Sequence, residues 1–352
     1  MAIRLMQVGM GGWGENWGTR VIQQSSDVEL VACVDVDAGR LERAQQILNL
    51  PAERCFLTLE SALASVEADA VLITASLPAH VPLALTSLNA GKHVLLEKPF
   101  APTVAEAQRV VETAAQRSRV LMISQNYRFF PAVQAVIALV REGTLGSIGT
   151  VRIDFRRYKN AAVPESQPYY RVWQPLLVDM AIHHFDLMRV VLGQEPSQIT
   201  CQAWNPPWSK FVDPPSAAAT ITFDGGAVVS YRGSWVSPGP RTCWSGVWHI
   251  ECTGGEIVWT SRDDTATDQV TVRPLGKRAR RVKLPEIALT DRRGSLQAFV
   301  QAVQTGQEPE CSGRDNLHSL ALMCAAVESA TSRLCISFAE RNPGASYSGV
   351  HA

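Results

Sequence analysis

Two adjacent histidines flanked by two aspartates stand in an otherwise apolar stretch, "DMAIHHFD", at residues 179–186. In an α-helix, which advances about 100° per residue, Asp179, His183 and Asp186 lie within roughly 60° of one another. His184 points well away from that face. A carboxylate four residues before a histidine can accept one ring N–H and leave the other nitrogen free for a substrate proton. The spacing therefore predicts a proton-transfer group.

The same residues permit two other interpretations. His183 with Asp179 or Asp186 can ligate zinc, because both residue types are zinc ligands. No H-x-x-x-H pair or cysteine partner accompanies them, so we predict that there is no metal site. The second alternative is structural: a histidine whose ring nitrogens are satisfied within a helix interface.

A glycine-rich turn near the amino terminus has the chemistry of a phosphate-binding loop. Gly9, Gly11 and Gly14 fit the pattern G-x-G-x-x-G between an expected strand at residues 3–8 and an expected helix. Glycines at this spacing allow a tight turn, close approach of a pyrophosphate, and a helix amino terminus whose free amides attract anions. The sequence therefore predicts a dinucleotide site.

An acidic residue at the end of the next expected strand favours one of the two nicotinamide dinucleotides. Asp35 follows Gly14 by 21 residues; it can hydrogen-bond the ribose diol of NAD and repels the 2′-phosphate of NADP. Asp37 is the second candidate for this role, and Arg40 leaves an opening for NADP. We therefore predict NAD as the cofactor, with NADP less favoured.

The order of expected strands and helices indicates two domains. Up to about residue 125, short apolar runs alternate with helical patterns, which is typical of a parallel, doubly wound Rossmann sheet. Beyond it, strand-like runs follow one another with turns between them, which indicates an α/β domain with a large, open, mostly antiparallel sheet. We therefore expect a Rossmann domain at residues 1–125 and a substrate-binding and oligomerisation domain at residues 126–352. Helices of the second domain are expected at 131–142, 176–193, 293–305 and 313–333.

Composition excludes several classes of protein. Of 352 residues 46% are apolar and 19% are charged, with a net charge of +0. This composition is typical of globular proteins, and a chain without net charge has no overall electrostatic attraction to nucleic acid or anionic lipid. The basic run "GKRARRVK" (276–283) is expected at a sheet edge. Eight cysteines without metal-type spacing, and no stretch long enough to span a bilayer, favour a cytoplasmic protein that partners neither nucleic acid nor membrane.

Several further motifs carry a resemblance to a known family. The stretch "LITASLPAHVPLALTSLNAGKHVLLEKPF" (72–100) ends in Glu97-Lys98-Pro99, and "NYRFFP" (126–131) and "SGRDNLHSLALM" (312–323) follow. Together with the glycine loop and "DMAIHHFD", these segments make the chain resemble the Gfo/Idh/MocA (glucose–fructose oxidoreductase/inositol dehydrogenase/rhizopine-catabolism) family over nearly its whole length. The resemblance implies oxidation or reduction of a carbinol carbon of sugars and cyclitols with NAD or NADP. It also implies a homodimer or homotetramer formed through the C-terminal sheet.

The resemblance assigns roles to individual residues. Lys98 matches the E-K-P lysine near the nicotinamide and the reacting oxygen. Asp179 and His183 match a D-x-x-x-H pair, and Asp186 matches the acid that follows it. Ala181 and "VWQPLLV" (172–178) depart from the family pattern, in which glycines are frequent, and these departures concern the shape of the substrate pocket. The expected catalytic residues are Lys98, Asp179 and His183. The expected cofactor-binding residues are Gly9, Met10, Gly11, Gly12, Trp13, Gly14, Asp35, Thr74, Ala75, Ser76, His80, Glu97 and Lys98. The expected substrate-binding residues are Lys98, Tyr127, Arg128, Tyr158, Asn160, Asp179, His183 and Asp186.

Four of the substrate-binding residues are expected from their places along the chain. Tyr127 and Arg128 follow the last Rossmann strand, where the chain passes between domains and can face a cleft. Tyr158 and Asn160 end a sheet strand before a loop and can bind hydroxyl groups. Packing in the core or at the surface is the alternative for each. Three tryptophans on strands either stack on a sugar ring or belong to the core: Trp235, Trp244 and Trp248.

Three classes of function are compatible with this cofactor and these residues. We favour an NAD-dependent dehydrogenase acting on a sugar, sugar derivative or cyclitol, with Lys98, His183 and Asp179 as the proton-transfer group. A glycoside hydrolase or lyase that holds NAD tightly and oxidises its substrate transiently is the second class, and a net redox change separates it from the first. The third class is a non-catalytic NAD-bound regulator, against which the intact catalytic set argues.

Overall fold

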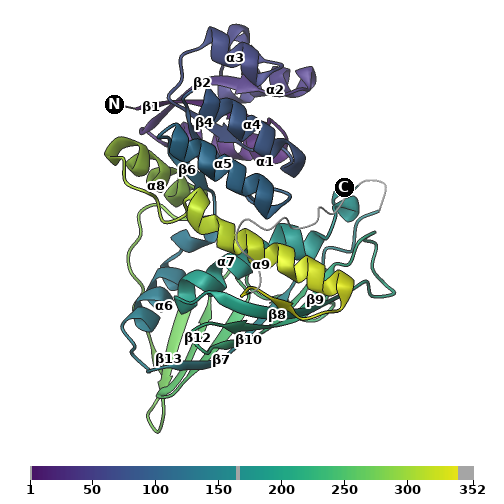
Figure 1. The fold of residues 1–352 in the computed structure, drawn as a ribbon, viewed down its shortest axis with the longest axis vertical. Helices are drawn as coiled ribbons and strands as arrows, with labels where there is room; N and C mark the ends of the chain where they lie inside the picture. The colour runs from purple at the N-terminus through teal and green to yellow at the C-terminus, as the bar shows by residue number, and fades with distance from the viewer. Residues whose placement is uncertain (1, 164–166, 340–352) are drawn as a thin grey trace. The chain divides into compact units, whose positions relative to one another are not determined.

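A computed structural model describes residues 2–163 and 167–339 and divides the chain into two compact units. The first unit combines Met1–Asn126 with Leu289–Leu317, and the second combines Tyr127–Ala288 with His318–Ala352. Among the described residues each unit contains one sheet (Figure 1).

The sheet of the first unit is parallel and has the strand order β3-β2-β1-β4-β5-β6. This is the strand order of a dinucleotide-binding Rossmann fold, and it confirms the predicted fold class. Every residue of the central strand β4 is buried, as expected for a parallel sheet covered on both faces. The strands are β1 (Ile3–Val8), β2 (Val28–Val34), β3 (Cys55–Phe56), β4 (Ala70–Ile73), β5 (His93–Leu96) and β6 (Leu121–Ile123).

Three helices of the first unit, α2, α3 and α5, begin at a side chain that caps them. Asp37 accepts from the backbone amides of Gly39 and Arg40 at the start of α2. At the start of α5 the Thr103 hydroxyl accepts from the Glu106 amide at 3.2 Å and donates to the Glu106 carboxylate at 2.7 Å. The helices are α1 (Gly12–Arg20), α2 (Ala38–Leu48), α3 (Leu59–Ser65), α4 (Leu77–Asn89) and α5 (Val104–Gln116).

A late segment of the chain returns to the first unit. It consists of α8 (Asp291–Thr305) and the beginning of α9 (Gly313–Ser332). The Ile123 amide donates to the Cys311 carbonyl at 2.9 Å, and the hydroxyls of Ser124 and Ser295 lie 3.2 Å apart. The expected division at residue 125 placed these residues in the second domain instead. The order of elements along the chain does not show that a helix near the carboxyl end packs on the sheet formed by the first 125 residues. Residues 340–352, which the same expectation included, lie outside the described residues.

The sheet of the second unit has the order β14-β13-β12-β11-β7-β10-β9-β8-β15. Its neighbouring strands pair antiparallel except for β7 and β10, which are parallel, so the predicted mostly antiparallel sheet is confirmed. β14 lies at one edge and contains two arginines of the basic run, as predicted. The strands are β7 (Ile148–Arg156), β8 (Pro196–Trp204), β9 (Ser216–Phe223), β10 (Val228–Ser234), β11 (Val247–Cys252), β12 (Gly255–Thr260), β13 (Gln269–Pro274), β14 (Arg280–Arg281) and β15 (Ile336–Ser337).

Helices cover one face of this second sheet. Figure 1 shows α6 (Pro131–Arg141), α7 (Ala181–Leu192) and the long α9 on the same face. The single α-helix expected over 176–193 is wrong in its first part, since Pro175–Met180 is a π-helical segment that precedes α7. The wider turns of a π-helix change the angular spacing of Asp179 relative to the residues of α7. No helix in the described part of the chain is long and apolar enough to cross a membrane.

Candidate functional site

The glycine loop of the first unit has a geometry that only glycine permits at two of its positions. Gly9 follows β1 with φ +95°, and a β-carbon there would stand 2.5 Å from the backbone nitrogen of Ala75. A β-carbon on Gly14 would stand 1.9 Å from the Gly9 carbonyl oxygen. The Thr74 hydroxyl donates to that same carbonyl at 2.6 Å. The loop therefore packs tightly against the residues that follow β4, and helix α1 approaches it closely.

The amino terminus of α1 offers backbone donors to an anion. Gly11 is its N-cap and contributes no side-chain hydrogen bond, and a β-carbon on Gly12 would meet nothing within 4 Å. The first helical hydrogen bond runs from the Glu15 amide to the Gly11 carbonyl at 2.8 Å, so the amides before Glu15 precede the helical ladder. Open space beside such amides fits the pyrophosphate of a dinucleotide.

Asp35 directly follows β2 and is bound to the glycine loop. Its Oδ2 accepts from the Met10 amide at 2.6 Å, and its Oδ1 accepts from the Asp37 amide at 2.9 Å. The Nη1 of Arg40 lies 3.7 Å from Oδ2. Asp37, the second candidate for the ribose contact, caps helix α2 with its Oδ1. These contacts place the Asp35 carboxylate, rather than that of Asp37, at the loop.

Three more of the expected cofactor-binding residues differ in their surroundings. The Met10 side chain is fully buried in an apolar cluster with Cys33, Leu41 and Leu48, so its backbone is the part that belongs to the loop. Trp13 is 44% exposed, and the Arg292 guanidinium carbon lies 4.2 Å from the centroid of its ring. Ser76 is the N-cap of α4.

The segment Glu97–Pro99 follows β5 and is held by buried partners. Trp17 donates its indole N–H to the Glu97 carboxylate at 2.7 Å. Burial raises the pKa of the Glu97 carboxyl, and the nearby Lys98 charge opposes that rise. His80 is buried as well, with its ring nitrogens 2.8 Å from the Pro99 carbonyl oxygen and 3.0 Å from that of Ala75. His80 thus connects the residue Ala75, after β4, to the segment that contains the partly buried Lys98.

His183 in the second unit lies flat against an aromatic ring. Its imidazole stacks on the Tyr127 phenol with ring centroids 4.0 Å apart and planes 5° from parallel. His183 is 6% exposed and Tyr127 is 3% exposed. Arg262 donates from Nη1 to the Tyr127 hydroxyl at 2.6 Å. The ring plane of His183 is thus fixed by packing, which a proton-transfer group requires.

Asp179 lies in the π-helical segment and is only partly buried. Its Oδ2 accepts a hydrogen bond from the Tyr169 hydroxyl at 2.6 Å. Burial, together with the Asp179 charge, holds the pKa of Tyr169 well above its ordinary range. Tyr169 therefore stays a neutral donor that orients the Asp179 carboxylate.

Arg128 and Asp186 bind each other in the interior of the second unit. The guanidinium donates from Nε to Oδ2 at 2.7 Å and from Nη2 to Oδ1 at 2.5 Å. Their side chains are 3% and 1% exposed. Ser319 of α9 donates to the same carboxylate at 2.8 Å. These contacts favour a structural role for both residues over the expected contact with substrate.

His184, the neighbour of the candidate proton carrier, is fully buried and paired at both nitrogens. Its Nε2 lies 2.9 Å from the Trp244 carbonyl oxygen, and its Nδ1 lies 3.0 Å from the Tyr231 hydroxyl. A carbonyl only accepts, so Nε2 carries the proton and Nδ1 accepts from Tyr231. Burial lowers the pKa of His184 to about 4. The ring is therefore neutral at physiological pH.

The remaining expected substrate residues differ in exposure. Tyr158 is 52% exposed, whereas Asn160 is 4% exposed and binds the loop around Trp208. The Asn160 side chain donates to the Trp208 carbonyl at 2.7 Å and accepts from the Lys210 amide at 2.9 Å. Of the three tryptophans expected on strands, only Trp248 lies in one, β11; it is fully buried and stacks on Trp259 with ring centroids 4.7 Å apart. Trp235 is also buried, so both belong to the core, while Trp244 is partly exposed.

Two family models match the chain in two successive segments. The model described as "Oxidoreductase family, NAD-binding Rossmann fold" matches residues 3–125, and the "GFO/IDH/MocA C-terminal domain" matches residues 133–258. The chain belongs to the Gfo/Idh/MocA family. This confirms the predicted resemblance, the NAD-binding Rossmann fold and the oxidoreductase class.

Relatives and solved structures agree with the family. The D-apiose dehydrogenase of Paraburkholderia graminis is 28% identical over 314 residues, which cover 86% of this chain and 81% of that protein. The myo-inositol 2-dehydrogenase of Thermotoga maritima is 25% identical over 334 residues, covering 93% and 96%. An oxidoreductase from Agrobacterium radiobacter, solved with NAD+, L-tartaric acid and magnesium, superposes with a TM-score of 0.82 at 22% identity, covering 96% and 98%. The WlbA dehydrogenase of Bordetella pertussis, solved with NADH and UDP-GlcNAcA, gives 0.80 at 21% identity, covering 96% and 99%. These structural likenesses show the fold.

Sequence reasoning missed two residues that contact the candidate site of this Gfo/Idh/MocA protein. Tyr169 stands in a 3₁₀ turn, Pro168–Arg171, and Arg262 follows strand β12. Neither belongs to a periodic apolar pattern or to a family motif quoted above, so no signal in the sequence distinguishes them. No group of three or more His, Cys, Asp or Glu side chains in the described ranges is arranged to hold a metal.

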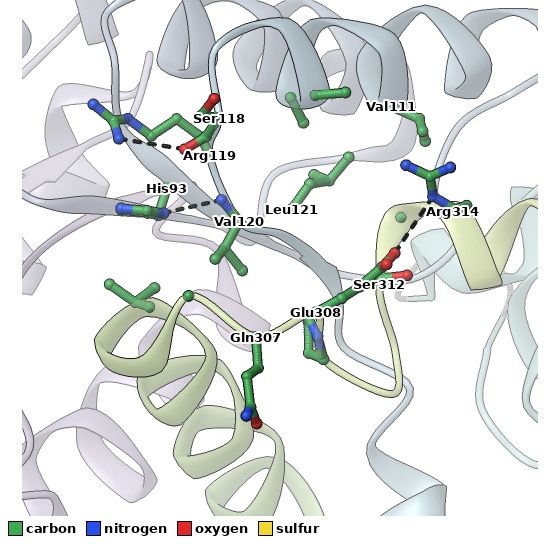
Figure 2. A pocket seen from close by; sticks show the side chains of 16 residues that line it. His93, Val111, Ser118, Arg119, Val120, Leu121, Gln307, Glu308, Ser312 and Arg314 are labelled. Carbon is green, nitrogen blue, oxygen red and sulfur yellow. Dashed lines mark hydrogen bonds and ion pairs between the residues drawn. The ribbon is translucent and has the colours of Figure 1, made fainter.

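A separate cavity of about 310 Å³ lies in the first unit (Figure 2). It is lined by His93 and Leu121, which begin β5 and β6, and by the start of α9 at Arg314. The glycine loop, Asp35 and Glu97 follow the carboxyl ends of their strands instead. None of the expected site residues lines this cavity, so it does not belong to the candidate site.

Proposed function

We propose that the protein is an NAD-dependent dehydrogenase that transfers a hydride between the nicotinamide and a carbinol carbon of a sugar, sugar derivative or cyclitol. The observation that carries the proposal is His183, held flat against Tyr127 in a chain of this oxidoreductase family. The substrate class is supported by the relatives whose names are D-apiose dehydrogenase and myo-inositol 2-dehydrogenase.

His183 takes the hydroxyl proton when the alcohol is oxidised. Alcohol oxidation requires such a base, because the proton must leave as the carbonyl forms. Asp179 orients the ring and stabilises the imidazolium, with Tyr169 donating to its Oδ2 at 2.6 Å. Lys98 supplies a positive charge that polarises the same substrate oxygen. NAD, when bound, accepts the hydride.

NAD is held by the glycine loop and by Asp35, and it is preferred over NADP. Gly9 and Gly14 let the loop and α1 pack closely against the backbone, and the open space beside Gly12 at the start of α1 receives the pyrophosphate. The Asp35 carboxylate accepts from the ribose hydroxyls and repels an added phosphate. Arg40, 3.7 Å from that carboxylate, lowers this discrimination without abolishing it.

Substrate recognition falls to Lys98, Asp179, His183 and the exposed Tyr158. Tyr127 supports His183 by stacking. Arg128 and Asp186 support α7 from within, and Asn160 fixes the loop at Trp208. These three supporting residues act on the shape of the substrate site rather than by contact with substrate.

The wider assembly is part of the same proposal. The protein forms a homodimer or homotetramer through the nine-stranded sheet of the second unit. It works in a reducing, cytoplasmic compartment, which is supported by eight cysteines without metal-type spacing. Sedimentation equilibrium measures the assembly, and a monomer at micromolar concentration contradicts that part.

A panel of sugars and cyclitols, assayed with NAD, tests the proposed reaction. We expect NADH to accumulate in proportion to the ketone formed, followed by the nicotinamide absorbance. Cleavage of a glycoside without net NADH indicates the hydrolase or lyase class instead. NAD binding without turnover of any panel member, in protein that is fully folded, indicates a regulator.

A further inference from the structure

The ring that supports His183 is itself held by an arginine. Arg262 donates from Nη1 to the Tyr127 hydroxyl at 2.6 Å, and its guanidinium carbon lies 4.5 Å from the centroid of the Tyr127 ring. The same guanidinium carbon lies 5.8 Å from the centroid of the Trp244 ring. A cation bound at the hydroxyl and near the ring restrains both the position and the plane of Tyr127.

Arg262 has a backbone conformation that residues with a β-carbon seldom adopt. Its φ is +57°, in the left-handed region. Asp268 stabilises this turn, because its Oδ1 accepts from the Arg262 amide at 2.9 Å. Its Oδ2 accepts from the Ser261 hydroxyl at 2.8 Å and from the Ala132 amide, at the start of α6, at 3.1 Å. The fold thus maintains an unfavourable backbone conformation at Arg262, which binds the Tyr127 hydroxyl, and such conformations are associated with functional sites.

We propose that Arg262 is a positioning residue for the reaction. It holds Tyr127, and Tyr127 holds the imidazole of His183 parallel to itself at 4.0 Å. This proposal rests on the proposed function, in which His183 carries the substrate proton. Proton transfer requires hydrogen-bond reach between base and substrate, and misplacement by about 1 Å can reduce the rate by roughly 100-fold. Arg262 therefore acts on the chemical step through Tyr127, without contact with the substrate.

Two single variants and their combination test the route through the Tyr127 hydroxyl. Arg262→Gln removes the cation, and Tyr127→Phe keeps the stacked ring but removes the hydroxyl that Arg262 binds. We expect each to reduce kcat roughly 10- to 100-fold, with a smaller change in KM and unchanged affinity for NAD. In the Tyr127→Phe background, adding Arg262→Gln should lower kcat little further, because the hydrogen bond between the two side chains is already lost. If the fold-loss of kcat in the double variant equals the product of the fold-losses in the two single variants, the proposal is overturned.

A matched control separates positioning from general damage to the fold. Arg333 is also an arginine with positive φ, +62°, but it is exposed at the end of α9. Arg333→Gln should keep wild-type kcat and KM. A kcat for Arg262→Gln equal to that of Arg333→Gln overturns the proposal.

A conservative variant keeps the test decisive if Arg262→Gln folds poorly. Arg262→Lys retains a positive donor for the Tyr127 hydroxyl, so its kcat should lie closer to that of the wild type. Equal kcat for the Lys and Gln variants, per folded molecule, overturns the proposal. His183→Ala is assayed beside them: full activity in that variant refutes the proposed function itself, whereas an inactive His183→Ala with an active Arg262→Gln refutes only the positioning role.

Discussion

Arg128 and Asp186 form a two-pronged ion pair in the interior of the second unit, with N–O distances of 2.7 and 2.5 Å. Ser319 donates to the same carboxylate, and Arg189 donates to the Ser319 hydroxyl at 2.7 Å. A buried charge without its counter-ion is costly, since desolvation is then uncompensated. The pair therefore links the segment after the Rossmann strands to α7 and α9.

Asp186→Asn should lower the free energy of unfolding by about 3–5 kcal/mol, because the buried Arg128 charge loses its counter-ion. The double variant Arg128→Met/Asp186→Leu should lie much closer to the wild type, since it removes both charges. Urea denaturation followed by tryptophan fluorescence measures both. If Asp186→Asn instead has wild-type stability and a raised KM for substrate, the result supports direct substrate binding by Asp186.

The Arg128–Asp186 pair also shows which features the sequence could predict. Most of the strands and helices depend on local periodicity and on residues close together in the chain, and the predicted fold class is confirmed. The partner of Asp186 is 58 residues away, so its contact depends on tertiary packing that no local pattern encodes. The same reason applies to residues 289–317, which return to the first sheet. The π-helical segment "PLLVDM" is almost wholly apolar and gives no periodic signal that distinguishes it from an α-helix.

Asp35→Ser should shift cofactor preference toward NADP by roughly tenfold or more, about 1.4 kcal/mol. The carboxylate that repels the 2′-phosphate is removed, while Arg40 remains as a nearby cation with 53% of its side chain exposed. Ratios of kcat/KM for the two cofactors measure the shift. Asp35→Ser/Arg40→Gln is the control, and it should lose most of the gained NADP activity. A wild type at least as efficient with NADP contradicts the assignment.

His184 should make the protein less stable in acid. Its pKa in the fold is about 4, below the ordinary value of 6.5, so the unfolded chain binds this proton more readily. The stabilisation is fully present above about pH 6.5 and is lost as the pH falls toward 4, by about 3 kcal/mol in total. Urea denaturation at a series of pH values measures it. His184→Gln, which does not titrate, should be less stable at neutral pH and should lack this part of the loss of stability in acid. If the unfolding free energy of the variant depends on pH in the same way as that of the wild type, His184 is not the cause of the acid dependence.

Lys98→Met should nearly abolish turnover while NAD still binds. Methionine keeps much of the side-chain bulk but removes the charge that polarises the substrate oxygen. The glycine loop and Asp35 are unchanged in this variant, so the dissociation constant for NAD, measured by fluorescence titration, should stay within a few-fold of the wild type. Near-normal turnover would remove Lys98 from the mechanism. Loss of NAD binding would place its role in cofactor affinity instead.

Deuterium transfer from the carbinol carbon tests the central claim most directly. The best substrate of the panel, deuterated at the carbon that is oxidised, is incubated with NAD and either the wild type, His183→Ala or His184→Ala, and the cofactor is analysed by mass spectrometry. The wild type should transfer one deuterium to the cofactor for each ketone formed. His184→Ala should retain most of this transfer per folded molecule, and His183→Ala should lose about 10²- to 10⁴-fold in rate. Product without deuterium in the cofactor, or full transfer by His183→Ala alongside failure of a folded His184→Ala, would contradict the account.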